Sequence, residues 1–206
     1  MKNTARYLLN RAGFTLIELL IVIALIGILA VAVLAAINPI EQLNRARDTG
    51  MESDATQLIS AIDRYYASQE KFPWVVPPAL AYGTTTTTNE AAYGFIDAID
   101  GGVGVCGSAV CSATGRLLAQ FELKPEFANR GFVKATAEDK KLYIAKDLGA
   151  SKSVYACWVP SSKSRRAQAV TGIAVGSTTR SPRDCTGILD GAWTVLSTAC
   201  VLCIPR

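Results

Sequence analysis

The feature that most restricts the fold of this chain is an apolar run close to its start. Residues 14–37 contain only three residues that are not apolar, Thr15, Glu18 and Gly27. As a helix the run would measure about 36 Å, which is enough to cross the hydrocarbon core of a bilayer. The remainder of the 206-residue chain has the composition of one ordinary globular domain. The sequence therefore predicts one membrane-spanning segment followed by one domain, and it excludes intrinsic disorder, a coiled-coil rod and a multi-span membrane protein.

The charges outside the run indicate its orientation. Lys2, Arg6 and Arg11 lie in the first thirteen residues, which contain no acidic residue, and basic flanks keep their end of a membrane helix in the cytoplasm. These three residues supply most of the formal net charge of +4, so the rest of the chain is nearly balanced and we predict no nucleic-acid partner. The run is long for the apolar core of a secretory signal, and no convincing cleavage site follows it, so a retained anchor is favoured over a cleaved signal.

Glu18 is the one charged residue in the apolar run. A carboxylate at this depth is costly unless it has a partner, so such residues usually have a function. Arg11 lies two helical turns away and could reach it only by snorkelling. A cut between Gly13 and Phe14 would instead create an α-amine within one turn of Glu18, able to pair with that carboxylate or with the Glu18 of a neighbouring copy. The alternative is a carboxylate without a function that snorkels to the membrane interface.

Residues 11–20, with the sequence RAGFTLIELL, resemble the processing motif of bacterial type IV prepilins and of type II secretion pseudopilins. The resemblance implies that a membrane-bound prepilin peptidase cuts directly after Gly13. It also implies that the new first residue, Phe14, is N-methylated, and that Glu18 is the fifth residue of the mature chain. The apolar run is retained in this scheme because the cut lies before it.

The resemblance implies two successive environments for the apolar run. Once the leader, residues 1–13, is removed, the helix of residues 14–37 would anchor the chain in the inner membrane, with its domain outside. The helix would then join a bundle of such helices in the core of an extracellular pilus. Glu18 would pair there with the Phe14 amine of an adjacent subunit, and an unpaired buried charge would reject wrong registers. The implied partners are the prepilin peptidase, the pilus assembly machinery, other pilins and copies of the chain itself.

The helical pattern continues beyond the membrane segment, and the resemblance extends to about residue 70. Over residues 38–70, apolar residues recur at helical spacing between polar ones, which is typical of an amphipathic helix. Pro39 removes a backbone hydrogen bond and is expected to kink the helix or to loosen the turn before it. Gly27 is a second expected point of flexibility. The helix is expected to end before Phe72 and Pro73.

Residues 71–206 are predicted to form a globular domain whose sheet covers the apolar face of the amphipathic helix. Segments rich in β-branched and aromatic residues predict strands at 141–145, 154–159, 167–175 and 193–204, and residues 116–127 fit a short helix or turn. Lys163, Arg165 and Arg166 are interpreted as a solvated hairpin loop, with a DNA-binding patch as the alternative. The predicted fold class is α+β: a long N-terminal helix packed on a small antiparallel sheet, the pilin roll.

Six cysteines lie in the predicted domain and none in the helix. They are Cys106, Cys111, Cys157, Cys185, Cys200 and Cys203. An even number of cysteines in an exported domain favours disulfide bonds. Cys106 and Cys111 are close enough to close a local loop, and the other four would tie the last strands together with a connectivity that the sequence leaves open. A redox Cys-x-x-Cys motif at the C-terminus and a zinc site are the alternatives, but we predict no metal.

The absence of histidine limits the chemistry of the chain. No Ser-His-Asp or Cys-His arrangement is possible, and no glycine-rich phosphate loop is present, so we predict neither an enzyme nor a cofactor. The leading hypothesis is a structural subunit of a type IV pilus. The alternatives are a pseudopilin of a type II secretion system, a minor pilin for adhesion or DNA uptake, and a plain membrane-anchored domain.

Overall fold

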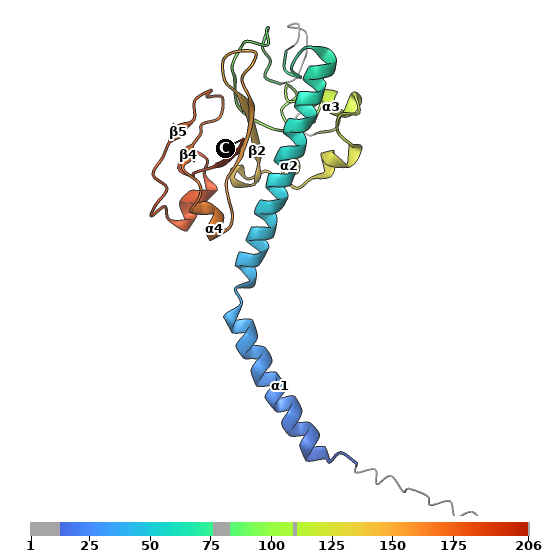
Figure 1. Ribbon diagram of the computed structural model, residues 1–206, viewed down its shortest axis with the longest axis vertical. Helices are drawn as coiled ribbons and strands as arrows, with labels where there is room; N and C mark the ends of the chain where they lie inside the picture. The colour runs from blue at the N-terminus through green and yellow to red at the C-terminus, as the bar shows by residue number, and fades with distance from the viewer. Residues whose placement is uncertain (1–12, 76–82, 109–110, 206) are drawn as a thin grey trace, which may run out of the picture. The chain divides into compact units, whose positions relative to one another are not determined.

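The structure is a computed structural model that describes residues 13–75, 83–108 and 111–205 (Figure 1). The chain divides into two compact units, Met1–Ile40 and Glu41–Arg206. The apolar helix belongs to the first unit, whereas the strands and the described hydrophobic core belong to the second.

Helix α1, Leu16–Ala36, is formed by the apolar run. Its segment Leu16–Leu34 has a mean hydropathy of 3.1 and none of it is buried, and among the described residues it is the one helix that is long and apolar enough to cross a bilayer. The helix satisfies its own backbone groups, but its large apolar side chains are exposed. The predicted long apolar helix is therefore confirmed, and its side chains need a lipid or protein surface to cover them.

Helix α2, Pro39–Gln69, follows after Ile37 and Asn38, which are not helical. Pro39 is the first residue of α2, a position where its missing N–H is not needed. Gly27 lies inside α1 without interrupting it, and flexibility at Gly27 and Pro39 stays a prediction. One face of α2 is buried in the core through small and aliphatic side chains: Met51, Ala55, Leu58, Ala61 and Ile62. The helix ends before Phe72, as the sequence predicts.

A four-stranded antiparallel sheet lies beside α2 (Figure 1), in the order β1-β2-β3-β6. Its strands are β1 Tyr93–Asp97, β2 Leu142–Lys146, β3 Val154–Trp158 and β6 Leu202–Ile204. Two short strands, β4 Thr171–Gly172 and β5 Ser181–Pro182, form a separate pair. The predicted α+β class, with a helix on a small antiparallel sheet, is confirmed.

The strand predictions are only partly correct. Strands β2 and β3 match two predicted segments to within a residue, but β1 lies where no strand is predicted. The prediction for 167–175 is wrong outside β4 and the isolated β-bridge from Val175 to Phe95, because residues 167–169 continue the turns of a short helix, α4, Lys163–Arg166. The prediction for 193–204 is wrong outside β6 and the bridge from Val201 to Thr171. Here a 3-10 helix, η3 Asp190–Thr194, leads into a turn that buries both Trp193 and Leu196.

Short helices occupy the connections. They are α3 Arg116–Ala119, η1 Pro125–Asn129 and η2 Glu138–Lys140, all between β1 and β2. The basic residues interpreted as a hairpin loop instead form the single turn of α4, with Ser162 as its N-cap. The segment is helical because the Ser162 hydroxyl accepts the N–H of Arg165 and so starts a helical turn.

Three disulfide bonds use all six cysteines. They join Cys106 to Cys111, Cys157 to Cys203, and Cys185 to Cys200. The first is the local loop that the sequence predicts, and the second joins two residues that face each other in the β3–β6 pair. Cys200 and Cys203 have different partners and none of the six thiols remains free, which argues against the redox and zinc alternatives.

Lys146 is a charged residue that is 0% exposed in β2. Its ammonium, which has three N–H donors, lies within hydrogen-bond distance of four backbone carbonyls: Asn89 O at 2.8 Å, Ala91 O at 3.4 Å, Asp147 O at 3.1 Å and Gly149 O at 2.7 Å. The side chain of Asn89 in turn holds the end of α2, because it donates to Glu70 O at 2.8 Å and accepts from Phe72 N at 3.2 Å. Lys146 therefore connects the segment before β1 to the turn after β2, and through Asn89 it also connects both to the end of α2.

Helix α3 ends in a Schellman motif whose left-handed residue is Phe121. The N–H of Phe121 binds Leu118 O at 3.1 Å and the N–H of Glu122 binds Leu117 O at 2.9 Å. Glycine is the usual residue here, since a side chain at a φ of 58° costs about 1 kcal/mol. The Phe121 side chain is 89% exposed, so burial of the ring does not offset that cost within the chain.

We expect the stability of the chain to fall above pH 10 because of Tyr93 and Tyr143. Both are buried, and burial raises the pKa of each phenol above its ordinary value. The unfolded state then loses its phenolic protons first, so stability is complete below pH 10 and decreases above it. The free energy of unfolding should fall by about 1.4 kcal/mol per pH unit for each tyrosine.

Denaturant unfolding between pH 9 and 11, at fixed ionic strength, measures this slope. The variant Tyr93→Phe should lose about half of it, because one of the two titrating groups is removed. A slope that is unchanged in Tyr93→Phe would contradict the assignment to this phenol.

Candidate functional site

The predicted cleavage junction lies in exposed, non-helical backbone. Residues 13–15 precede the first turn of α1, and Phe14 is 80% exposed. A Cβ atom added to Gly13 would meet no atom within 4 Å. Exposed, non-helical backbone is the kind of segment that a protease can bind, and cutting at the Gly13–Phe14 bond stays a prediction.

Thr15 and Glu18 form a capping box at the start of α1. The Glu18 carboxylate accepts the Thr15 N–H at 2.8 Å and the Thr15 hydroxyl at 2.7 Å, while the Glu18 N–H binds the Thr15 hydroxyl oxygen at 3.3 Å. These bonds satisfy donors that a helix N-terminus leaves open, and they place a negative charge where the helix dipole favours it.

The capping box also fixes the position of the Glu18 carboxylate relative to the predicted cut. The carboxylate accepts a hydrogen bond from the backbone nitrogen of Thr15, and the nitrogen of Phe14 is only one residue before it in the chain. A terminal amine at Phe14 would therefore lie close to this carboxylate. The geometry supports the predicted chemistry of an amine and a carboxylate at the same helix end, and the roles of Gly13, Phe14 and Glu18 remain predictions.

The other predicted site residues lie apart from this helix end. Gly27 is in the middle of α1, Pro39 begins α2, and the six cysteines are in the second unit. In the part of the chain that the structure describes, no group of three or more histidine, cysteine or acidic side chains is placed to hold a metal ion.

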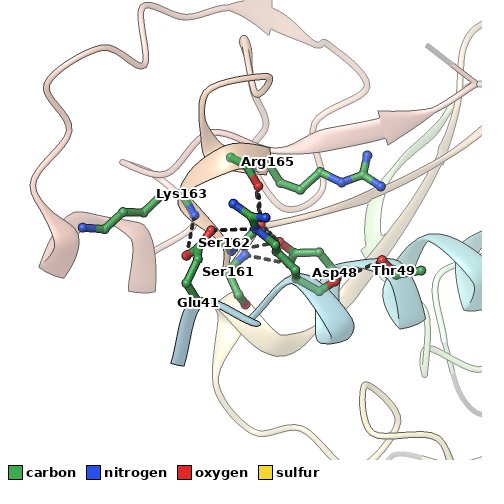
Figure 2. Close-up of polar contacts among 9 residues, drawn as sticks. Glu41, Asp48, Thr49, Ser161, Ser162, Lys163 and Arg165 are labelled. Atoms are coloured by element: carbon green, nitrogen blue, oxygen red, sulfur yellow. Dashed lines mark hydrogen bonds and ion pairs between the residues drawn. The ribbon is translucent and has the colours of Figure 1, made fainter. Parts of the chain in front are cut away.

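A second group of polar contacts joins α2 to the α4 loop, and the sequence gives little sign of it (Figure 2). Asp48 is 1% exposed and accepts hydrogen bonds from Ser161 N at 2.7 Å, Ser162 N at 2.8 Å and Ser162 Oγ at 2.6 Å. Such charge-assisted bonds are about twice as strong as neutral ones. Asp48 thereby caps the turn that Ser162 begins.

Two further acids of α2 continue this row of contacts. Glu41 accepts the Lys163 N–H at 3.1 Å, and this bond lowers the pKa of the Glu41 carboxyl below its ordinary value. Glu52 pairs with Arg165. The three acids are spaced i, i+7 and i+11, so they lie along one side of α2. This spacing, together with the polar and basic sequence SSKSRR at residues 161–166, is the pattern from which the contact between α2 and the α4 loop could be predicted. The side chains of Arg165 and Arg166 are engaged in contacts within the unit, with Glu52 and Asp190 respectively, which argues against the DNA-binding alternative.

Comparison with known families agrees with the motif at the helix end. Residues 8–34 match the family model described as the prokaryotic N-terminal methylation motif. No curated protein and no solved structure matches the chain. The matched residues contain the Gly13–Phe14 junction, the Thr15–Glu18 capping box and α1 up to Leu34, so the resemblance inferred from residues 11–20 is confirmed.

Proposed function

We propose that this chain, which carries the N-terminal methylation motif that is the hallmark of type IV pilin and pseudopilin precursors, is a structural subunit of a type IV pilus. The observation that carries the proposal is that the motif includes an apolar helix of which no residue in Leu16–Leu34 is buried. A motif for cutting and methylation prepares the end of this helix, and among the described residues the helix is not part of the hydrophobic core. Both features suit a segment that is held first by lipid and then by other subunits.

Assembly would exchange one apolar environment for another. The side chains of Leu16–Leu34 would leave the lipid of the inner membrane and pack against the same helix of neighbouring subunits, so little apolar surface would meet water at any stage. Affinity between subunits would then come from close packing and polar pairing. Glu18 would supply that pairing through the methylated Phe14 amine of an adjacent subunit, and a misplaced subunit would leave the charge unpaired.

The unit Glu41–Arg206 would form the outer surface of the pilus. Its disulfide bonds suit an oxidising location outside the cytoplasm. The contacts of Glu41, Asp48 and Glu52 with the α4 loop fasten the early turns of α2 to this unit. Because of this attachment, the position of α2 in the filament would determine the position of the outer surface of the unit.

We expect mass spectrometry of the assembled protein to find a mature chain that starts at N-methylated Phe14 and lacks residues 1–13. The variant Gly13→Val should accumulate as the uncut precursor, because a β-branched side chain stiffens the backbone that the peptidase must bind. Gly27→Val is the matched control, because it adds the same side chain where no atom lies within 4 Å, and it should be cut normally. Recovery of only the full chain from Met1 would contradict the proposal.

Electron microscopy with an antibody against the Glu41–Arg206 unit tests the kind of filament. Labelling along the whole length of long surface filaments supports the pilus subunit. Labelling confined to filament tips would indicate a minor pilin, and a short filament that stays in the periplasm would indicate a pseudopilin of a secretion system.

A further inference from the structure

The exposed ring of Phe121 is a protrusion that the isolated chain does not need. Its backbone sits in the left-handed C′ position of the Schellman motif, which glycine fills best. The side chain is 89% exposed. A phenylalanine here serves neither the end of α3 nor the core, and non-glycine residues in this conformation are concentrated at functional positions.

A hollow on the same unit is similarly unexplained by the fold. It has a volume of about 490 Å³ and lies between α2 and the segment that follows η1. Met51 and Phe132 line it and are almost fully buried, and Gly50 and Gly131 line it and are exposed. Asp54, a buried acid whose carboxylate pairs with Arg130 at 3.2 Å, also lines it. The floor of the hollow is therefore apolar apart from this paired carboxylate, and the hollow is open above.

The two glycines keep this hollow open at a cost to the helix. Gly50 lies inside α2, where glycine is one of the poorest helix formers. A Cβ atom added to Gly50 or to Gly131 would meet no atom within 4 Å, and neither residue has a left-handed backbone. The fold would therefore accept larger residues at both positions, and the effect of glycine is to leave room for something from outside.

The rim of the hollow suits an aromatic occupant. Arg47 and Lys140 both line it, and the cationic ends of such side chains are attracted to the face of an aromatic ring. The Arg47 guanidinium is already held near the hollow, because it donates to Asp139 O at 3.3 Å. Because the Asp54 carboxylate is already paired with Arg130, the remaining apolar floor and the cationic rim match a phenyl ring better than a polar ligand.

The protrusion and the hollow lie at different heights along α2. Glu122, next to Phe121, pairs with Arg64 at 3.0 Å, whereas the hollow is level with Gly50. Gly50 and Arg64 are fourteen positions apart in α2, which corresponds to about 21 Å of helix. If Phe121 of one copy entered the hollow of a second, parallel copy, the two copies would be shifted along the helix axis by this length. The hollow of the first copy and the Phe121 of the second would then remain free for further copies. Such a contact is heterologous and does not close, which is the geometry of a filament.

We propose that Phe121 of one copy of this chain inserts into the hollow between Gly50 and Gly131 of a second copy. This inference rests on the proposed pilus function. It adds to the helix bundle a second contact, made by the outer unit, which fixes the stagger between neighbouring subunits.

Disulfide trapping in intact filaments tests the contact directly. A full-length chain with Phe121→Cys and Gly50→Cys should give a ladder of covalent oligomers on non-reducing gels, which reductant collapses to the single chain. The matched control is Phe121→Cys with Thr49→Cys, because residue 49 points about 100° away around the helix, and it should give no ladder. Either single variant should also give none. A double variant that yields only monomers, or only dimers from a closed reciprocal pair, would overturn the proposal.

The variant Phe121→Gly separates assembly from folding. It should raise the Tm of the full chain in detergent by about 2–4 °C, because glycine relieves the left-handed backbone. It should also reduce the yield of sheared filaments about fivefold or more if the ring supplies a buried aromatic contact. Normal yield from Phe121→Gly would overturn the inference while leaving the pilus function intact. A wild-type chain that forms no filament would overturn both.

Discussion

Replacing Glu18 by alanine is expected to leave cutting and methylation intact and to lower the amount of assembled filament about tenfold or more. The carboxylate lies in the capping box beyond the Gly13–Phe14 bond, so its loss leaves the exposed junction unchanged. In the assembled state, however, the Phe14 amine of a neighbouring subunit would be buried without an anion. Immunoblots of sheared filaments against whole cells measure the assembled fraction, and mass spectrometry of the membrane fraction measures processing.

The variant Glu18→Gln separates the charge of this residue from its capping role. Glutamine can still accept the Thr15 N–H, as it does in other capping boxes, but it carries no charge. If charge pairing drives assembly, Glu18→Gln should fail as Glu18→Ala does. Assembly of Glu18→Gln at the wild-type level would show that the hydrogen bonds of the cap, and not the charge, are what the filament needs.

Replacing Lys146 by methionine is expected to destabilise the chain by about 3–5 kcal/mol. Methionine has a similar length but no donor, so four backbone carbonyls around the ammonium would lose a partner in a site that water does not reach. The loss also loosens Asn89, which holds the end of α2. Thermal unfolding of the full chain in detergent should show a Tm lower by about 10 °C or more.

The matched control for this variant is Lys152→Met. Lys152 belongs to the same β2–β3 connection but is exposed, and an exposed substitution of this kind should change the free energy of unfolding by less than about 0.5 kcal/mol. If Lys146→Met and Lys152→Met unfold at the same temperature, the carbonyl cage around Lys146 does not stabilise the fold.

The helices of this chain could be predicted from its sequence because their signals are long and periodic. The apolar run gives α1, and the apolar spacing from residue 51 to residue 62 gives the buried face of α2. The strands are harder to predict. Strand β1 has the sequence YGFID, in which Gly94 interrupts the strand pattern, and its place is set by pairing with β2, which lies almost fifty residues further along. Propensity does not contain that information.

The disulfide connectivity could not be predicted from the sequence, because it too depends on pairing between distant segments. Cys157 meets Cys203 because β6 returns to pair with β3, so the pairing follows from the topology and not from the spacing of the cysteines. The N-terminal methylation motif could be recognised from the sequence because the residues that carry it, from Gly13 to Glu18, are six neighbours in the chain. Other features depend on contacts that form only in the folded chain, so no local sequence pattern predicts them. They include the carbonyl cage around Lys146, the contacts of Asp48 and the exposed ring of Phe121.

The bridge between Cys157 and Cys203 has a mechanical consequence for a subunit that is pulled. The two residues are 46 positions apart in the chain, and their Cα atoms are 4.1 Å apart. Without the bridge, the same stretch could be drawn out to about 150 Å. With it, tension that enters at Cys157 passes directly to Cys203, and the intervening segments, which include α4, β4, β5 and η3, carry no load. The surface that these segments display would keep its shape while the rest of the chain is under strain.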